Sequence, residues 1–288
     1  MFRAHVCMFI TDRTPEPTEI ARAVEERGLD GLFVPEHTHI PIHSRSPFLP
    51  DGELPEAYRR TYDPFIALAM AAAVTERIRL GTGICLITQH DPIVLAKTVA
   101  SLDRLSKGRL ILGVGAGWNT EEIENHGTPF KQRWPILRER ILAMKRIWRQ
   151  DEPQFHGHFV TFNSMWSYPK PLQPGGPPIW IGSNSKWVPE RVAEYADGWM
   201  PIVGRDGGGE LTALRDACAH RGRRFEELTL GLFYAPTDRA EADARQDEGY
   251  TDFIFGVPSG TRDEVLGKLD QIATLANHLR QRANLATR

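Results

Sequence analysis

The sequence predicts an α/β protein in which eight strands close into a single (β/α)8 TIM barrel, one domain spanning residues 1–288. Short apolar segments recur along the chain, and each is followed by a segment with helical signals. No such strand directly follows another, and this alternation is typical of a parallel sheet covered by helices. There are eight strand-then-helix units, and the 288 residues are enough for a closed barrel.

The first half of the chain supplies four units. Strands are expected at 4–10, 31–35, 78–87 and 110–112, and helices at 18–27, 64–76, from 92 onwards and at 135–150. Two of these helices begin with Asp-Pro, which places proline at the first helical position, where its missing N–H costs nothing. Insertions are predicted after strands two and four, at 40–62 and 151–176. Long segments without periodicity are usually functional or mobile.

The second half supplies the remaining four units. Strands are expected at 178–182, 198–203, 229–235 and 251–257, and helices within 183–196 and at 210–220, 239–246 and 263–279. A glycine-rich loop, 204–209, precedes the second of these helices. Active sites of such barrels lie at the carboxyl ends of the strands, so the residues just after each strand are the functional candidates.

The composition argues against several classes of protein. A formal net charge of −2 gives no basis for a nucleic-acid partner. The longest apolar run, 65–74, is far shorter than the ~20 residues that span a bilayer, and the start of the chain does not resemble a signal peptide. The three cysteines form no Cys-x-x-Cys pair and are expected to be buried thiols. We therefore expect a cytoplasmic protein that acts on a small molecule.

The fourth strand ends in a glycine-rich segment, GRLILGVGAGWN (108–119). Gly115 and Gly117 allow another group to approach the backbone closely, and Trp118 and Asn119 follow them. Such a strand end is a suitable place for a flat ligand. The alternative is that the glycines only form a tight turn into the next helix. The dinucleotide-binding fingerprint is not met, because it would need glycine in place of Trp118.

Glu36 and His37 directly follow the second strand. Histidine is the side chain that most readily gives or takes a proton near pH 7, and an adjacent carboxylate could orient it. A metal site at His37 and His39 would need further histidines and an aspartate after later strands, which the sequence does not provide, so no metal site is predicted. The structural alternative is a hydrogen-bond network that holds the insertion at 40–62.

Two further strand ends carry small residues. Thr82, Gly83 and Ile84 lie in the third strand, where two glycines suggest a bulge or a close approach of a ligand. The fifth strand ends in small donors that could supply N–H groups to an anion or could simply cap the next helix: Gly182, Ser183, Asn184 and Ser185.

These strand ends together resemble the luciferase-like monooxygenase superfamily, and within it the branch that uses the deazaflavin coenzyme F-420. The resemblance rests on four segments: FVPEHTHIP (33–41), RLGTGICLITQHDP (79–92), LSKGRLILGVGAGWNTEEIENHG (105–127) and PPIWIGSNSKWVPERVAEYADGWMP (177–201). The match is spread over roughly two-thirds of the chain, from the first strand to the sixth. The last two strands carry no motif of the family.

The resemblance implies a flavin or deazaflavin ring that lies across the strand ends, against the turn at Gly83 and Ile84. Deazaflavin relatives often have a non-proline cis peptide there. Glu36 and His37 match the place where deazaflavin dehydrogenases carry an acidic residue and a histidine, and residues 182–185 match the region that holds the cofactor phosphate. Sugar-phosphate dehydrogenases of the group carry glutamate where this chain has Trp118, which argues against their acid and their substrate.

Three functions remain open from the sequence. With coenzyme F-420, the protein would transfer a hydride between the deazaflavin and a small organic substrate. With FMN, it would be the oxygenating part of a two-component monooxygenase. The third function is flavin binding without turnover. The resemblance also implies a homodimer, whereas the substrate would depend on the two insertions and the last two strands.

Overall fold

The computed structural model describes residues 2–44, 46, 53–204 and 211–286, so most of the predicted loop 204–209 lies outside them. The barrel strands are β1 (Arg3–Cys7), β2 (Gly31–Val34), β3 (Arg79–Thr82), β4 (Cys85–Leu86), β5 (Leu110–Gly115), β8 (Ile179–Ile181), β9 (Gly198–Trp199), β10 (Thr229–Phe233) and β11 (Asp252–Gly256). The α-helices are α1 (Pro17–Glu26), α2 (Pro64–Val74), α3 (Pro92–Leu105), α4 (Thr120–Asn125), α5 (Arg133–Arg149), α6 (Val188–Tyr195), α7 (Leu211–His220), α8 (Arg239–Asp247) and α9 (Arg262–Ala286).

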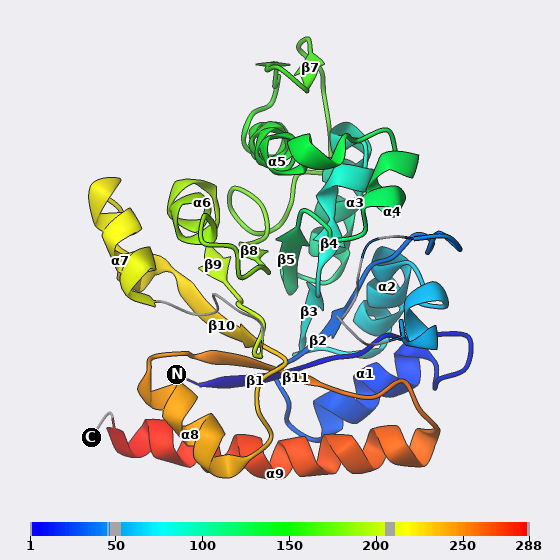
Figure 1. Ribbon diagram of the computed structural model, residues 1–288, viewed down its shortest axis with the longest axis vertical. Coiled ribbons are helices and arrows are strands. Elements are labelled where there is room, and N and C mark those ends of the chain that lie inside the picture. The colour runs from blue at the N-terminus through cyan, green and yellow to red at the C-terminus, as the bar shows by residue number, and fades with distance from the viewer. Residues whose placement is uncertain (1, 45, 47–52, 205–210, 287–288) are drawn as a thin grey trace.

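The strands form one closed parallel sheet, which confirms the predicted (β/α)8 barrel. Neighbouring strands follow the order β3-β2-β1-β11-β10-β9-β8-β5-β4, and β3 also pairs with β5, which closes the ring. The helices lie outside the strands, as Figure 1 shows for α1, α2, α3, α6 and α9. Because every barrel strand runs in the same direction, their carboxyl ends all meet at one end of the barrel.

The third strand position is split into β3 and β4 by a cis peptide bond between Gly83 and Ile84. This confirms the expectation of a cis peptide or bulge at this turn. The side chain of Ile84 lies against two glycines of neighbouring strand ends: a Cβ atom at Gly115 would lie 1.8 Å from its Cδ1, and one at Gly182 would lie 2.6 Å from its Cγ2. A larger residue at either position would therefore require the Ile84 side chain to shift.

Two apolar layers hold the barrel together. The interior is filled by a compact cluster of side chains from the strands: Cys7, Phe33, Ile111, Trp180, Met200, Phe233 and Ile254. A larger buried cluster lies between the outer faces of the strands and the helices. All three cysteines are buried free thiols, as expected.

The sixth strand is shorter than predicted. Only Gly198–Trp199 is regular strand, after which proline at position 201 has no N–H to continue the ladder. Pairing with β10 resumes as an isolated bridge between Ile202 and Phe233. The last helix, in contrast, continues beyond the predicted end at 279 to Ala286.

The two insertions lie in different parts of the molecule. The first contributes the 3-10 helix η1 (Glu56–Arg59), which reaches the carboxyl end of the barrel. The second contains the hairpin β6 (Phe155–His156) and β7 (Thr161–Phe162), which lies beyond α5 at the top of Figure 1. It returns to the amino end of β5, where Gln173 donates to the carbonyl of Leu110 at 2.8 Å. This follows from topology, since a segment after a helix returns to the amino ends of the strands. None of residues 151–176 lines the pocket described below.

In the described part of the chain, no helix is both long enough and apolar enough to cross a membrane.

Candidate active site

A pocket of about 390 Å³ opens at the carboxyl ends of the strands. Most of the residues predicted for the site line it: Glu36, His37, Gly83, Ile84, Gly117, Trp118, Gly182, Ser183, Asn184 and Ser185. Three predicted cofactor residues are not among its lining: Thr82, Gly115 and Asn119.

His37 is paired with a carboxylate that the sequence did not suggest. Its Nδ1 lies 2.9 Å from Oε2 of Glu122 in α4, and the two side chains are only 6% and 1% exposed. Among the described residues, the other ring nitrogen, Nε2, has no hydrogen-bond partner, while the ring lines the pocket. A carboxylate on one nitrogen fixes the orientation of the ring and leaves the second nitrogen for a ligand.

Glu36 does not orient His37, contrary to expectation. Its Oε2 accepts the backbone N–H of Leu86 at 2.5 Å, and its Oε1 lies 2.7 Å from Nε2 of His90. The strand ends at Val34, so the two adjacent side chains leave the backbone toward different neighbours. Burial disfavours a charge on His90, but its hydrogen bond to Glu36 and the nearby carboxylate charge outweigh this and raise the pKa of His90.

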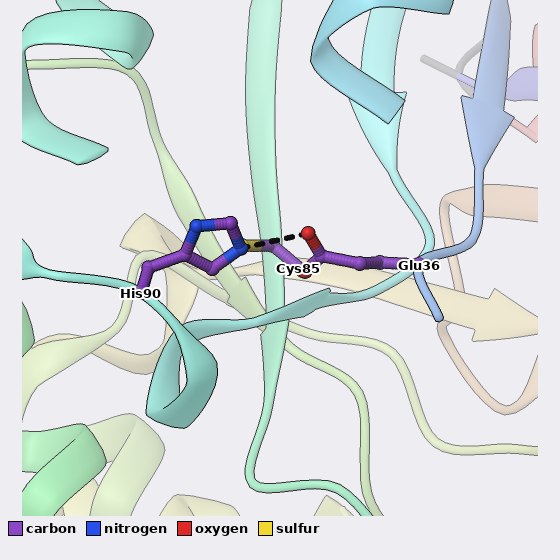
Figure 2. A group of neighbouring side chains, drawn as sticks. All are labelled: Glu36, Cys85 and His90. Carbon is purple, nitrogen blue, oxygen red and sulfur yellow. Dashed lines mark hydrogen bonds and ion pairs between the residues drawn. The ribbon is translucent and has the colours of Figure 1, made fainter. Parts of the chain in front are cut away.

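Glu36, His90 and Cys85 are the one group in the described residues whose ligand atoms are close enough for a metal ion, within 4.8 Å of one another (Figure 2). Both carboxylate oxygens already accept hydrogen bonds. Burial, and then the charge of Glu36, keep the pKa of the Cys85 thiol well above its ordinary value, so the sulfur is a neutral donor beside the carboxylate. These contacts account for the cluster as a hydrogen-bonded group that ties β2 to β4.

The residues after the glycine-rich end of β5 have different roles: some line the pocket, and others support the next helix. Trp118 lines the pocket, with its ring centroid 5.9 Å from that of His37, so it lies at the barrel mouth as predicted. Asn119 instead caps α4, because its Oδ1 accepts the N–H of Glu122 at 3.1 Å. This cap sets the first turn of the helix that carries the partner of His37. Gly117, with a φ of 80°, makes the turn between β5 and α4.

Thr82 also has a structural contact. It is fully buried, and its hydroxyl donates to the carbonyl of Gly113 at 2.7 Å, which links β3 to β5. Gly115 acts through its lack of a side chain, because it makes room for Ile84. Neither residue lines the pocket, but both support residues that do or the strands that carry them.

At the end of β8, the predicted segment 182–185 lines the pocket, but one of its side chains is already hydrogen-bonded within the protein. The Asn184 side chain bonds both backbone groups of Ile202: its Nδ2 donates to the carbonyl at 2.8 Å, and its Oδ1 accepts the N–H at 2.7 Å. This fixes the chain after β9. α6 begins without a side-chain cap, so neither Ser183 nor Ser185 is the helix cap proposed as the alternative for them.

Two arginines that the sequence analysis missed form a cationic region at one side of the pocket. Arg133 lines it and stacks on Phe130, with its guanidinium carbon 3.8 Å from the ring centre, and Arg191 stacks in the same way on Trp134 at 3.9 Å. Within the described chain, neither forms an ion pair, and Nε of Arg133 and Nη1 of Arg191 are buried without a hydrogen-bond partner. Burial, and to a lesser extent the charge of Arg133, lower the pKa of Arg191.

Two neighbouring guanidinium groups without a carboxylate are costly unless an anion joins them. The only sequence signal was their position at the starts of the helices that follow β5 and β8. Tyr58 of η1 and Phe9, which follows β1, complete the lining near His37 and were also missed.

This chain belongs to the luciferase-like monooxygenase family, whose sequence model matches residues 11–287. An uncharacterized protein of Mycobacterium tuberculosis is 39% identical to it over 276 residues, which are 92% of this chain and 95% of the relative. The F420-dependent glucose-6-phosphate dehydrogenase of Nakamurella multipartita is 29% identical over 245 residues, 81% of this chain and 66% of the relative.

Solved structures with the same fold include two oxidoreductases. The monooxygenase RslO1 of Streptomyces bottropensis matches with a TM-score of 0.77 at 20% identity, over 98% of this chain and 99% of that one. An F420-dependent secondary alcohol dehydrogenase, solved with an F420–acetone adduct, matches with a TM-score of 0.74 at 17% identity, over 95% and 98%. The predicted family is thus confirmed, and its members support an oxidoreductase.

Proposed function

We propose that this protein transfers a hydride between a deazaflavin of the coenzyme F-420 type and a small organic substrate. The observation that carries the proposal is that one pocket joins a carboxylate-bound histidine, His37, to an uncompensated guanidinium, that of Arg133. The first suits proton transfer beside a reacting carbon, and the second suits the anionic part of a cofactor.

The residues present fit such a cofactor. Gly83, Ile84 and Gly182 form a surface on which a flat ring can lie, and both glycines are tightly packed: a Cβ at Gly83 would lie 3.0 Å from the ring of Phe233, and one at Gly182 would lie 2.6 Å from Cγ2 of Ile84. Arg133, together with Ser183 and Ser185 of the same lining, would hold the phosphate. When bound, the deazaflavin would supply or accept the hydride.

The chain's own residues would manage the proton. Glu122 holds Nδ1 of His37, so Nε2 is the atom that takes the substrate proton or returns it. Glu122 is a positioning residue, because it touches His37 rather than the substrate. Trp118 and Tyr58, whose rings lie 5.9 and 5.2 Å from that of His37, would keep water away from this nitrogen.

A second candidate function, FMN-dependent monooxygenation, is favoured by the fold match to a monooxygenase. Titration of the purified protein with F-420 and with FMN, followed by cofactor fluorescence, separates the two. We expect F-420 to bind and FMN to bind more weakly. Micromolar binding of FMN without binding of F-420 would contradict the proposal and favour the monooxygenase, and binding without any turnover would favour the non-catalytic barrel.

The cationic region can be tested in the same titration. Arg133→Gln should weaken cofactor binding about tenfold, the equivalent of one lost charged contact. Arg138→Gln is the matched control, because Arg138 pairs with Glu194 on the outer surface and does not line the pocket. Equal binding by the Arg133 variant and wild type would show that the phosphate is held elsewhere.

A further inference from the structure

We propose that the substrate is an uncharged organic molecule with a flat ring, and that Tyr58 is the residue that selects it. This inference rests on the hydride-transfer function proposed above and concerns the half of the pocket around His37. It departs from the sugar phosphate that the name of the Nakamurella relative implies for that enzyme.

Three aromatic side chains surround His37. The ring of Phe9 is nearly parallel to it, at 13° and 6.5 Å between centroids; Tyr58 lies 5.2 Å away, and Trp118 approaches edge-on at 71°. Phe9 and Tyr58 also contact each other at 4.3 Å. These four rings come from four different segments, and all line the same pocket. A flat apolar body can stack within such a set of rings, with its reacting group at the histidine.

In the described lining, no side-chain charge beyond the His37–Glu122 pair is available near His37 to compensate a charged substrate. Apart from His37, the charged residues in the described lining are Glu36 and Arg133. Both oxygens of Glu36 are already hydrogen-bonded, to Leu86 and His90. Arg133 stacks on Phe130 at the start of α5, where the cofactor's anionic group would occupy it. Burying a charge without a partner is strongly unfavourable, so the site selects neutral molecules.

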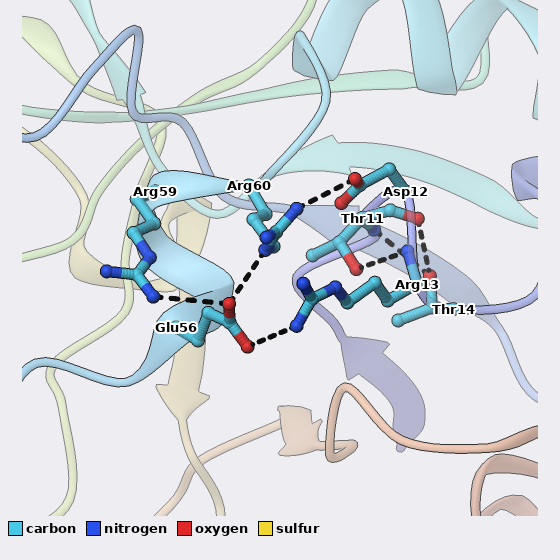
Figure 3. A network of polar contacts seen from close by, with 7 residues as sticks. All are labelled: Thr11, Asp12, Arg13, Thr14, Glu56, Arg59 and Arg60. Carbon is cyan, nitrogen blue, oxygen red and sulfur yellow. Dashed lines mark hydrogen bonds and ion pairs between the residues drawn. The ribbon is translucent and has the colours of Figure 1, made fainter.

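Tyr58 is held in place by an ionic network on its own short helix. Glu56 accepts hydrogen bonds from Arg59 and Arg60 through Oε1, at 3.2 and 2.9 Å, and from Arg13 through Oε2 at 2.8 Å (Figure 3). Arg60 continues to Asp12 at 2.8 Å. The arginines on Glu56 hold the pKa of its carboxyl below the ordinary value, so it stays charged near neutral pH.

Backbone contacts hold the same segment to the end of β1. Thr61 forms an antiparallel bridge with Thr11, and the N–H of Tyr62 donates to the carbonyl of Ile10 at 2.9 Å. Phe9 directly precedes Ile10, which accepts the hydrogen bond, so one attachment places both Phe9 and Tyr58 at the pocket. The first insertion therefore supplies a fixed aromatic wall.

For an alcohol of this class, Nε2 of His37 would accept the hydroxyl proton while the carbinol carbon gives up its hydrogen with two electrons. A bound oxidised deazaflavin would be the acceptor of that hydride, which leaves the ketone and a protonated His37. The reverse transfer would reduce the ketone. The rings would orient the carbinol carbon, and they take no part in the electron balance.

Binding to the cofactor-free Arg133→Gln variant gives a readout that is independent of turnover, and it removes the guanidinium with which a carboxylate could pair. Acetophenone and 4-acetylbenzoate share one ring and differ in charge, and calorimetry can rank them. We expect acetophenone to bind and 4-acetylbenzoate to bind at least about tenfold more weakly. Binding of 4-acetylbenzoate as tight as that of acetophenone would overturn the proposal.

Variants test the part assigned to Tyr58. Tyr58→Ala should weaken acetophenone binding about tenfold, whereas Tyr58→Phe, which keeps the ring, should stay within about threefold of wild type. Tyr168→Ala removes an exposed tyrosine on the second insertion and should change nothing. Unchanged binding by Tyr58→Ala would show that Tyr58 does not select the substrate.

Failure of this inference differs from failure of the proposed function. If F-420 binds and 1-phenylethanol is not oxidised while a charged alcohol is, the substrate class is wrong and the function stands. If acetophenone binds as expected but F-420 does not, the pocket preference stands and the hydride-transfer function is wrong.

Discussion

The two ends of the barrel each bury a pair of histidine and carboxylate, yet the two pairs have different surroundings. At the amino end, Nε2 of His5 lies 3.0 Å from Asp252, and both side chains are at most 1% exposed. At the carboxyl end, Nδ1 of His37 lies 2.9 Å from Glu122, with 6% and 1% exposed. The distances and burial are thus nearly the same, so they cannot distinguish a structural pair from a functional one.

The difference lies in what surrounds each ring. His5 packs against Phe33 and Trp180 inside the barrel, and the guanidinium of Arg3 also contacts Asp252, at 3.2 Å. Although burial opposes it, these partners hold the pKa of Asp252 below its ordinary value. His37, in contrast, borders an open pocket. The comparison teaches that access to a ligand, rather than pairing, marks the functional histidine.

The largest expected effect is on turnover at the carboxyl end. His37→Ala should lower kcat about 10²–10⁴-fold, the usual contribution of general acid–base catalysis, while cofactor affinity changes little. His37→Asn should be similarly slow, since it can hydrogen-bond but cannot titrate. Steady-state kinetics and the cofactor titration check this, and near-normal turnover of both variants would make His37 structural.

Glu122→Gln is the companion variant for that experiment. Because Gln keeps the size of the side chain but not its charge, it should reduce kcat less than His37→Ala and should alter the pH profile of kcat. A purely structural Glu122 would leave the shape of the pH profile unchanged.

The next effect concerns the free energy of unfolding at the amino end. Asp252→Ala leaves the buried ring of His5 and the half-buried guanidinium of Arg3 without their carboxylate and should lower the unfolding free energy by about 3–5 kcal/mol. Urea denaturation measures this loss, and the folded fraction should keep wild-type kcat. If turnover fell as far as in the His37 variants, the division between the two ends would be wrong.

The smallest effect is expected at the third pair, Glu36 and His90. Since the pKa of His90 is raised in the folded state, its stabilising charge is fully present below the ordinary value of 6.5 and is lost as the pH rises through the folded-state pKa. His90→Gln keeps a neutral donor. It should therefore be less stable than wild type by about 1 kcal/mol at pH 6, and the difference should shrink by pH 9.

Denaturation of both proteins at the two pH values decides this last point. A difference that is equal at pH 6 and pH 9 would show that the charge on His90 contributes nothing, so that the pair is an ordinary neutral hydrogen bond.

The fold could be predicted because its signals are local. Apolar runs, Asp-Pro helix starts and the glycines within 78–87 each report on their own segment, and the cis turn at Gly83 and Ile84 was among the outcomes expected there. The position of the second insertion could also have been inferred. It follows a helix, and the connections after helices lie at the amino ends of the strands.

The partners within the site could not be predicted in the same way. Glu122 lies 85 residues beyond His37, and beyond Val34 no strand alternation fixes where a side chain points. Glu36 was assigned to His37 because it is adjacent in sequence, and the fold instead directs it to His90. Arg133 and Tyr58 carry no motif, and only the closure of the barrel brings them to the pocket.

The contact of Ile84 with Gly115 and Gly182 also constrains how this barrel can evolve. A methyl group at either glycine would overlap Ile84 unless that side chain shifted, so enlargement there is disfavoured while isoleucine is present. Shrinking Ile84 first opens a space that alanine at position 115 or 182 can fill. The three positions therefore have a favoured order of change, and an engineered library that begins at Ile84 should retain more reshaped pockets than one that varies the three positions independently.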